Sequence, residues 1–261
     1  MARAQPPVIA LLTDFGAADW YVACVKGVVL SRCPAARLVD ITHEVPAQDV
    51  QAGAVVLASA MRWFPPRTVF VCVVDPGVGT ARPLLAARAD GYALVGPDNG
   101  LLALALDRAA RRQVVRLTTR RYWLPTVSRT FHGRDILAPV AAYLAGGGAL
   151  ARLGPVVARY HAVAIPPVRR RPGGGLEGCV LHVDHFGNLI TNLPDRVIAG
   201  GRARTVRYRT RSVRVVPTYA DAEAGELVAL AGSSGYVELA VRNGSAAARC
   251  RARRGDRVQL R

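Results

Sequence analysis

The first third of the chain alternates short apolar runs with segments whose apolar residues recur at helical spacing. Residues 8–12, 37–41 and 68–74 are predicted as strands, and residues 19–31 and 49–64 as helices. This β-α-β-α-β order is typical of a parallel sheet with helices on both faces. It predicts an α/β fold whose ligands bind beyond the carboxyl ends of the strands.

Each of these three predicted strands ends at or just before an aspartate, namely Asp14, Asp40 and Asp75. The carboxyl edge of the predicted sheet is therefore acidic. Four more elements complete the predicted layer: strands over residues 84–89 and 92–95, and helices over residues 101–110 and 134–144.

The composition changes after residue 146, and residues 154–175 combine prolines, arginines and three consecutive glycines, as a linker does. Short β-rich segments follow, separated by glycine, proline and asparagine, which predicts a small barrel or sandwich. These segments are residues 178–183, 189–192, 205–208, 212–216, 226–231, 236–241 and 257–260. We therefore expect an N-terminal α/β domain over residues 1–155, a linker over 156–175 and a C-terminal β domain over 176–261.

The formal net charge is +17, and Lys26 is the only lysine among 35 basic residues. A basic surface could bind nucleic acid by displacing counterions from phosphates, and residues 202–214 alternate arginine with apolar residues. The arginines nevertheless accompany alanine, glycine and proline throughout the chain, without one patch of interleaved aromatic residues. Compositional bias is the favoured interpretation, and a non-catalytic nucleic-acid-binding protein remains an alternative.

The five cysteines lie mostly in apolar runs and form no Cys-x-x-Cys pair. This pattern favours buried free thiols in a reducing cytoplasm. We expect no signal peptide, and no apolar run approaches the roughly 18 residues of a membrane span. The sequence therefore predicts a soluble, cytoplasmic protein without a membrane partner.

Three residues suggest catalysis, namely Asp75, Arg82 and His132, each on a predicted turn next to an apolar run. A carboxylate, a guanidinium and an imidazole can together hold and polarise one water molecule. Each residue also has a purely structural interpretation, as part of a turn or as a helix cap. An enzyme is the first hypothesis.

Residues 182–185 read His-Val-Asp-His, which raises the question of a metal site. On a strand, His182 and Asp184 would share one face and His185 would lie on the other, with no cysteine or second histidine pair nearby. We therefore predict no metal, and we expect Asp184 to face an organic ligand.

Six motifs occur in order: residues 11–16 (LLTDFG), 39–43 (VDITH), 74–80 (VDPGVGT), 95–100 (VGPDNG), 130–135 (TFHGRD) and 184–192 (DHFGNLITN). Together they resemble the S-adenosyl-L-methionine (SAM) hydroxide adenosyltransferase family, also called SAM hydrolases, which is related to fluorinase and chlorinase. The resemblance implies an α/β domain followed by an antiparallel β-barrel. It also implies a homotrimer with each site between neighbouring subunits.

The resemblance further implies the reaction, in which SAM and water give adenosine and L-methionine, with SAM as substrate and no separate cofactor. The catalytic set of the family corresponds to Asp75, Arg82 and His132. We expect His132 to accept the proton of the attacking water and Arg82 to stabilise the developing hydroxide. Asp75 is expected to be the electrostatic partner of His132 or to accept from the water itself.

Substrate-binding residues carry over by position in the same way. On the adenosine side, Asp14 is expected to hold the ribose hydroxyls and Phe186 to stack near adenine. Asn188 is expected to hydrogen-bond the edge of the adenine ring. Arg242 and Asn243 resemble a further adenine-side segment of the family.

On the methionine side, the resemblance implies that Asp184, Ser233 and Ser234 bind the amino and carboxylate groups. Ser234 stands where halogenating relatives tend to have arginine. Those relatives also carry a longer loop after the Asp75-type turn and lack the complete catalytic set. A halogenase is therefore the second enzymatic alternative, and water is the favoured nucleophile.

Overall fold

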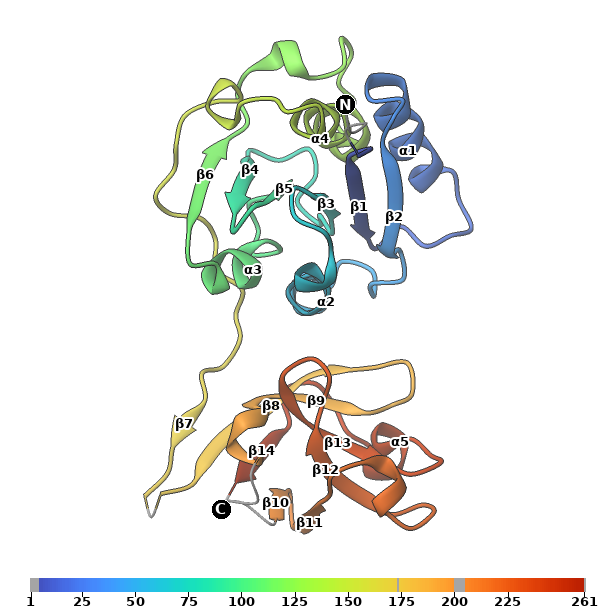
Figure 1. Cartoon of the computed structure of the whole chain (residues 1–261), viewed down its shortest axis with the longest axis vertical. Helices are drawn as coiled ribbons and strands as arrows, with labels where there is room; N and C mark the ends of the chain where they lie inside the picture. The colour runs from blue at the N-terminus through green and yellow to red at the C-terminus, as the bar shows by residue number, and fades with distance from the viewer. Residues whose placement is uncertain (1–4, 173, 200–204, 261) are drawn as a thin grey trace. The chain divides into compact units, whose positions relative to one another are not determined.

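The structure of the protein is a computed structural model that describes residues 5–172, 174–199 and 205–260. The chain divides into two compact units, Met1–Ala164 and Ile165–Arg261. The units are coloured blue to green-yellow and yellow to red in Figure 1.

The first unit is built on a six-stranded sheet in the order β2-β1-β3-β5-β4-β6. Strands β2, β1, β3 and β5 pair in parallel, and β4 is antiparallel to both of its neighbours. The strands are β1 Val8–Thr13, β2 Arg37–Thr42, β3 Val69–Val73, β4 Leu84–Ala89, β5 Tyr92–Pro97 and β6 Arg112–Arg116. The prediction of an α/β fold with a mostly parallel sheet is confirmed.

Helices cover both faces of this sheet, because successive residues of each strand point to opposite sides. Ile9 and Leu11 of β1 pack with α1 and α4, whereas Ala10 and Leu12 pack with α2 and α3. Figure 1 shows the two helix pairs on either side of the strands. The helices are α1 Tyr21–Arg32, α2 Val50–Ala60, α3 Ala103–Arg108 and α4 Ala138–Ala145.

The edge strand β6 was absent from the sequence prediction. Its five residues contain only Val114 and Val115 as apolar residues, and arginine stands at both ends. The two valines are buried, and the strand pairs with β4. A pattern this short is too weak to predict a strand without knowledge of the neighbouring strand.

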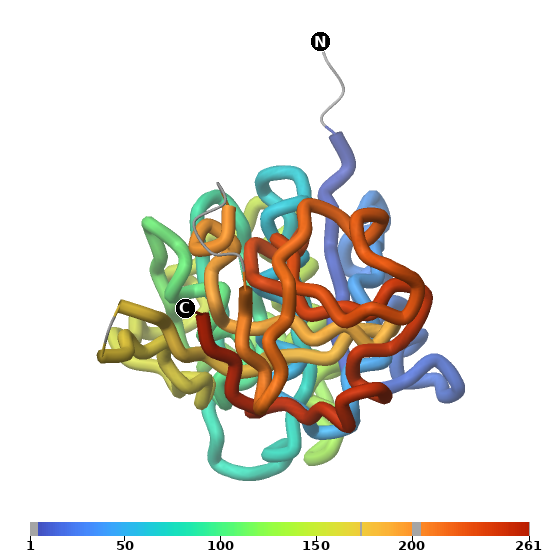
Figure 2. Tube along the Cα trace, turned by 90° about the horizontal axis from the view of Figure 1, so that it is seen from below, coloured from blue at the N-terminus to red at the C-terminus, as the bar shows by residue number. Residues whose placement is uncertain are grey.

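The second unit closes seven strands into a barrel, in the order β14-β10-β11-β12-β13-β9-β8, with β8 pairing back to β14. The pairings are antiparallel except for the short β11–β12 contact, which is parallel. The elements are β7 Arg169–Arg170, β8 Leu176–Val183, β9 Leu189–Pro194, β10 Thr205–Tyr208, β11 Arg211–Val215, β12 Leu227–Ala231, β13 Tyr236–Val241, α5 Ala246–Cys250 and β14 Arg257–Leu260. The predicted C-terminal barrel is confirmed, and Figure 2 follows its trace from orange to dark red.

The arginine-rich stretch at residues 202–214 falls partly outside the described residues, which resume at 205. Its described part forms β10 and β11, where apolar side chains point inward and arginines point outward. Val206, Tyr208 and Val213 are buried in the barrel core, whereas Arg207 and Arg214 are exposed. The alternation is therefore that of an ordinary barrel strand.

All five cysteines lie in the described part of the chain, and none forms a disulfide. Cys72, Cys179 and Cys250 are buried, and burial raises the pKa of Cys72 and Cys179. Among the described helices, none has the length and apolar character needed to cross a membrane. The described residues also contain no group of three or more metal-ligating side chains.

Two helical glycines offer a matched test of the packing against the sheet. A Cβ on Gly53 of α2 would lie 2.7 Å from Leu101 Cδ1 and 3.1 Å from Val74 Cγ2, whereas a Cβ on Gly27 of α1 would meet nothing within 4 Å. We expect Gly53→Ala to lower the free energy of unfolding by about 1–3 kcal/mol through overpacking. Gly27→Ala should raise it by up to about 1 kcal/mol through helix propensity.

Chemical denaturation of both variants measures these changes. Equal effects of the two substitutions would contradict the close approach of α2 to the sheet.

Candidate active site

The loops that follow β1 and β3 begin side by side at the carboxyl edge of the sheet. Thr13 at the end of β1 is paired with Val73 at the end of β3, and the Asp14 amide donates to the Val73 carbonyl at 3.4 Å. Asp14 and Asp75 therefore belong to neighbouring loops. Asp40, within β2, has a structural role instead, because its carboxylate pairs with Lys26 Nζ at 2.6 Å and lies 3.0 Å from His43 Nε2.

A tight turn returns Arg82 to Asp75. The Val78 amide donates to the Asp75 carbonyl at 3.2 Å, and the Thr80 amide donates to the Gly77 carbonyl at 3.1 Å. Gly79 has a φ of +82°, and a Cβ there would lie 2.7 Å from the Arg129 carbonyl oxygen. Glycine is thus required both by the backbone conformation and by the close approach of the loop that carries His132.

The turn beginning at Gly133 brings His132 to the same place. Gly133 starts a π-helical turn, Gly133–Leu137, that continues into α4. A Cβ on Gly133 would lie 3.4 Å from the methyl groups of Val73, so this turn packs directly on the end of β3. The buried Asp135 fixes the preceding loop by accepting from the Ser128 amide at 2.8 Å and from Arg134 Nε at 2.6 Å.

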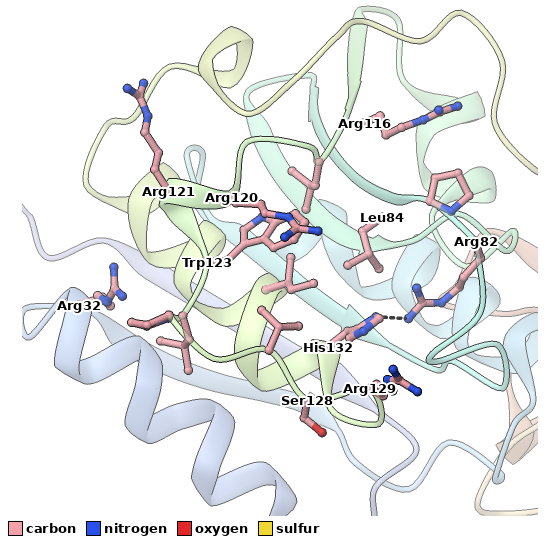
Figure 3. A pocket seen from close by; sticks show the side chains of 16 residues that line it. Arg32, Arg82, Leu84, Arg116, Arg120, Arg121, Trp123, Ser128, Arg129 and His132 are labelled. Carbon is pink, nitrogen blue, oxygen red and sulfur yellow. Dashed lines mark hydrogen bonds between the residues drawn. The ribbon is translucent and has the colours of Figure 1, made fainter.

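Asp75, Arg82 and His132, the three residues singled out in the sequence, form one connected cluster. Arg82 Nε donates to Asp75 Oδ1 at 2.6 Å, and Arg82 Nη2 donates to Asp75 Oδ2. Arg82 Nη2 also lies 3.1 Å from His132 Nδ1 (Figure 3). The guanidinium is therefore the central member of the cluster.

The ion pair is largely removed from solvent, since the Asp75 and Arg82 side chains are 6% and 10% exposed. A guanidinium can only donate, so His132 Nδ1 accepts, and the neutral ring carries its proton on Nε2. Burial and the charge of Arg82 lower the pKa of His132, and the charges of Asp75 and Asp135 partly oppose this. The imidazole thus stays neutral at neutral pH.

This electrostatic arrangement predicts opposite shifts for two variants. Removing a cation with Arg82→Met should raise the pKa of His132, whereas removing an anion with Asp75→Asn should lower it further. Titration of the His132 ring by NMR measures both, with the wild-type midpoint expected below the ordinary value of about 6.5. Shifts of the same sign in the two variants would contradict the arrangement.

Asp14 lies next to this cluster and is partly engaged already. Its Oδ2 accepts from the Gln48 amide at 2.8 Å, and Gln48 adopts a φ of +65° to make this contact. Its Oδ1 accepts no hydrogen bond from the described residues. The preceding residue, Thr13, lies with its Oγ1 2.8 Å from His43 Nδ1, a contact that was not predicted from the sequence.

In the second unit, Asp184 and Asn188 close the turn between β8 and β9. Asp184 accepts from the Asn188 amide at 2.8 Å and from Asn188 Nδ2 at 3.0 Å. Gly187 has a φ of +81°, and a Cβ there would meet Ser245 Oγ at 2.0 Å. The tip of the turn presents Phe186, which is 73% exposed. A large exposed aromatic ring on a tightly fixed turn is suited to stacking on a flat ligand.

The other residues expected at the site have different surroundings. Arg242 Nη1 donates to the carbonyls of Ala220 at 3.1 Å and Ala222 at 2.5 Å, so this guanidinium fixes a loop. Asn243 is exposed at a φ of +57°. Ser234 Oγ is shielded from solvent and makes no hydrogen bond. Ser233 is exposed in the same turn.

Glu238 is a buried acid that the sequence analysis did not single out. It is 5% exposed, and its Oε1 accepts from Tyr219 Oη at 2.5 Å. Burial and the nearby charge of Asp184 raise the pKa of Glu238. The available sequence signal was an acidic residue between the apolar residues Val237 and Leu239 of β13.

Comparison with known proteins identifies the family. The sequence profile of the SAM hydroxide adenosyltransferase N-terminal domain matches residues 9–154, and that of the C-terminal domain matches residues 178–259. The chain belongs to the SAM hydroxide adenosyltransferase family. The resemblance noted from the sequence motifs is thereby confirmed.

Similar members of the family carry a common description. A protein from Salinispora tropica, 43% identical over 98% of both chains, is called (R)-S-adenosyl-L-methionine hydrolase. A Thermus thermophilus protein of the same description is 40% identical over 91% of this chain and 93% of its own. A fluorinase from Actinoplanes sp. is 32% identical over 90% of each chain.

Solved structures share the fold. The crystal structure of an uncharacterized conserved protein from Thermotoga maritima matches with a TM-score of 0.90 and 33% identity, over 97% of this chain and 99% of that one. A conserved hypothetical protein from Thermus thermophilus matches with a TM-score of 0.81 and 37% identity, over 98% of this chain and 100% of that one.

Proposed function

We propose that this protein hydrolyses SAM to adenosine and L-methionine. The observation that carries the proposal is the connected Asp75–Arg82–His132 cluster at the carboxyl edge of the parallel sheet. The relatives at 40–43% identity, which are named as SAM hydrolases, support the same reaction.

The reaction is an in-line displacement at the ribose C5′ carbon. A water oxygen forms the new bond to C5′ while the C5′–S bond breaks. The electron pair of the broken bond goes to sulfur, and methionine leaves as a neutral thioether. The water proton passes to a base. A sulfonium is already a good leaving group, so the protein needs no cofactor to activate it and acts by positioning and deprotonating water.

Within the cluster, Arg82 stabilises the developing hydroxide, and Asp75 holds Arg82 in place through two hydrogen bonds. His132 is the proposed proton acceptor. The ring nitrogen that carries a lone pair is Nδ1, which accepts from Arg82 Nη2 at 3.1 Å, so the attacking water is proposed to replace this direct contact. A water that bridges His132 Nδ1 and the Arg82 guanidinium would therefore lie between the proton acceptor and the cation that stabilises the developing hydroxide.

Substrate-binding residues are proposed in each unit. Asp14 binds the ribose hydroxyls with its unused Oδ1, and Phe186 stacks on adenine. Asn188 Nδ2 donates to Asp184, and we propose that Asn188 Oδ1 accepts from the adenine amino group. Arg242 supports this side through the loop that it fixes, with Asn243 at the adjoining turn.

We propose that Asp184 binds the methionine amino group and that Ser233 and Ser234 bind the carboxylate. The Ser234 hydroxyl, buried without a partner, supports this assignment. We further propose a homotrimer in which each site is completed by a neighbouring subunit, and a cytoplasmic location. The exposed Phe186 supports the homotrimer, and the five free cysteine thiols support the cytoplasmic location.

The products of the purified protein test the function. Incubation with SAM should give adenosine and methionine by chromatography, in the same amounts with and without chloride or fluoride. Halogenated adenosine would show a halogenase instead, and unchanged SAM would contradict the enzyme.

Single variants test the cluster. His132→Gln keeps an acceptor for Arg82 but loses basicity, so we expect kcat to fall by about 10²–10⁴ with little change in KM. Asp75→Asn and Arg82→Met should also act mainly on kcat. His161→Gln is the matched control, because His161 is an exposed histidine near Asp98 outside the cluster. A His132→Gln enzyme with full turnover would show that His132 only orients Arg82.

A further inference from the structure

A second feature lies directly beside the proposed catalytic cluster. A cavity of about 790 Å³ is bordered by Arg82 and His132 on one side. Its wall carries six arginines and no aspartate or glutamate, and the proposed hydrolysis uses only Arg82 among them. The six are Arg32, Arg82, Arg116, Arg120, Arg121 and Arg129.

Figure 3 shows how these side chains lie. Arg82 and Arg129 lie on the same side of His132, and the Arg120 guanidinium lies beside Trp123, 5.8 Å from the ring centre. Arg121 points away from the others, and its Nη2 donates to Tyr122 Oη at 2.7 Å. The six arginines come from the end of α1, the loop before β4, the end of β6 and the segment between β6 and Gly133, so different elements converge on one space.

Most of this positive charge is not neutralised within the protein. Arg82 is paired with Asp75. Within residues 5–172, 174–199 and 205–260, no carboxylate pairs with Arg116, Arg120 or Arg129. Like charges held around a concave space repel one another and concentrate a positive potential there. A bound anion with several charges would relieve this repulsion.

We propose that this cavity binds a polyphosphate chain, either free or as part of a nucleotide. Guanidinium groups recognise phosphate oxygens through paired hydrogen bonds, and three unpaired arginines match a ligand with several phosphates better than a single halide. The volume is within the range of small-molecule sites. A concave site of this size favours a short polyanion over a nucleic acid strand, which needs an extended groove.

Binding here would act on the reaction, an effect that rests on the proposed function. A phosphate beside Arg82 would bind the same guanidinium that is proposed to stabilise hydroxide. It would also favour the protonated form of His132, because it adds a negative charge nearby. We therefore infer that polyphosphate inhibits SAM hydrolysis.

Isothermal titration calorimetry of the full chain with sodium triphosphate, at constant ionic strength, tests the site without any need for turnover. One site per chain is expected. Arg116→Gln and Arg120→Gln should each weaken binding about tenfold, because each removes a charge-assisted contact. Arg37→Gln is the matched control, since Arg37 is an exposed arginine of β2 outside the cavity and should change affinity less than twofold.

Further titrations decide the source of the phosphates. Equal affinity for triphosphate and ATP would indicate a free chain, and tighter binding of ATP would indicate a nucleotide. Absent binding, or equal weakening by all three variants, would overturn the proposal. The proposal would also be overturned if a single-stranded RNA oligonucleotide bound in a manner that depends on Arg116 and Arg120 while triphosphate did not bind.

The regulatory effect is tested by measuring SAM hydrolysis with and without triphosphate. Loss of triphosphate inhibition in Arg120→Gln, with hydrolysis retained, would support the effect. Wild-type hydrolysis that triphosphate leaves unchanged would overturn it.

Discussion

The pairing of Arg82 with Asp75 is the interaction on which the proposed site depends. Both side chains are almost fully buried, and a buried charge is costly unless it is paired and hydrogen-bonded. Because Asp75 fixes two donors of the guanidinium, the Nη2 group is held at His132. One ion pair thus sets the position of the cation, the charge state of the imidazole and the space in which a water could be held.

The α/β architecture explains why these residues meet. Parallel strands end at a common edge, so the loops after β1 and β3 carry Asp14 and Asp75 to neighbouring positions. The turn at Gly133 packs on Val73 and adds His132 from a distant part of the chain. The arginine-lined cavity adjoins the same cluster, which places an inferred anion site next to the proposed nucleophile.

Much of this could be predicted from the sequence, for identifiable reasons. The strands of the parallel sheet and barrel alternate clearly with turns, and Asp75 and His132 stand in glycine-containing turns that follow apolar runs. The edge strand β6 gave too few apolar residues to be recognised. The contact between Arg82 and His132 depends on a tertiary approach across fifty residues, and the burial of Glu238 depends on Tyr219 from another loop, so local patterns could not reveal them.

Hydrolysis in ¹⁸O-labelled water, with mass spectrometry of both products, tests the central claim that the cluster directs water to C5′. We expect one ¹⁸O atom in the 5′-hydroxyl of adenosine and unlabelled methionine. Unlabelled adenosine, or ¹⁸O in an amino-acid product such as homoserine, would show attack at another carbon and would contradict the account.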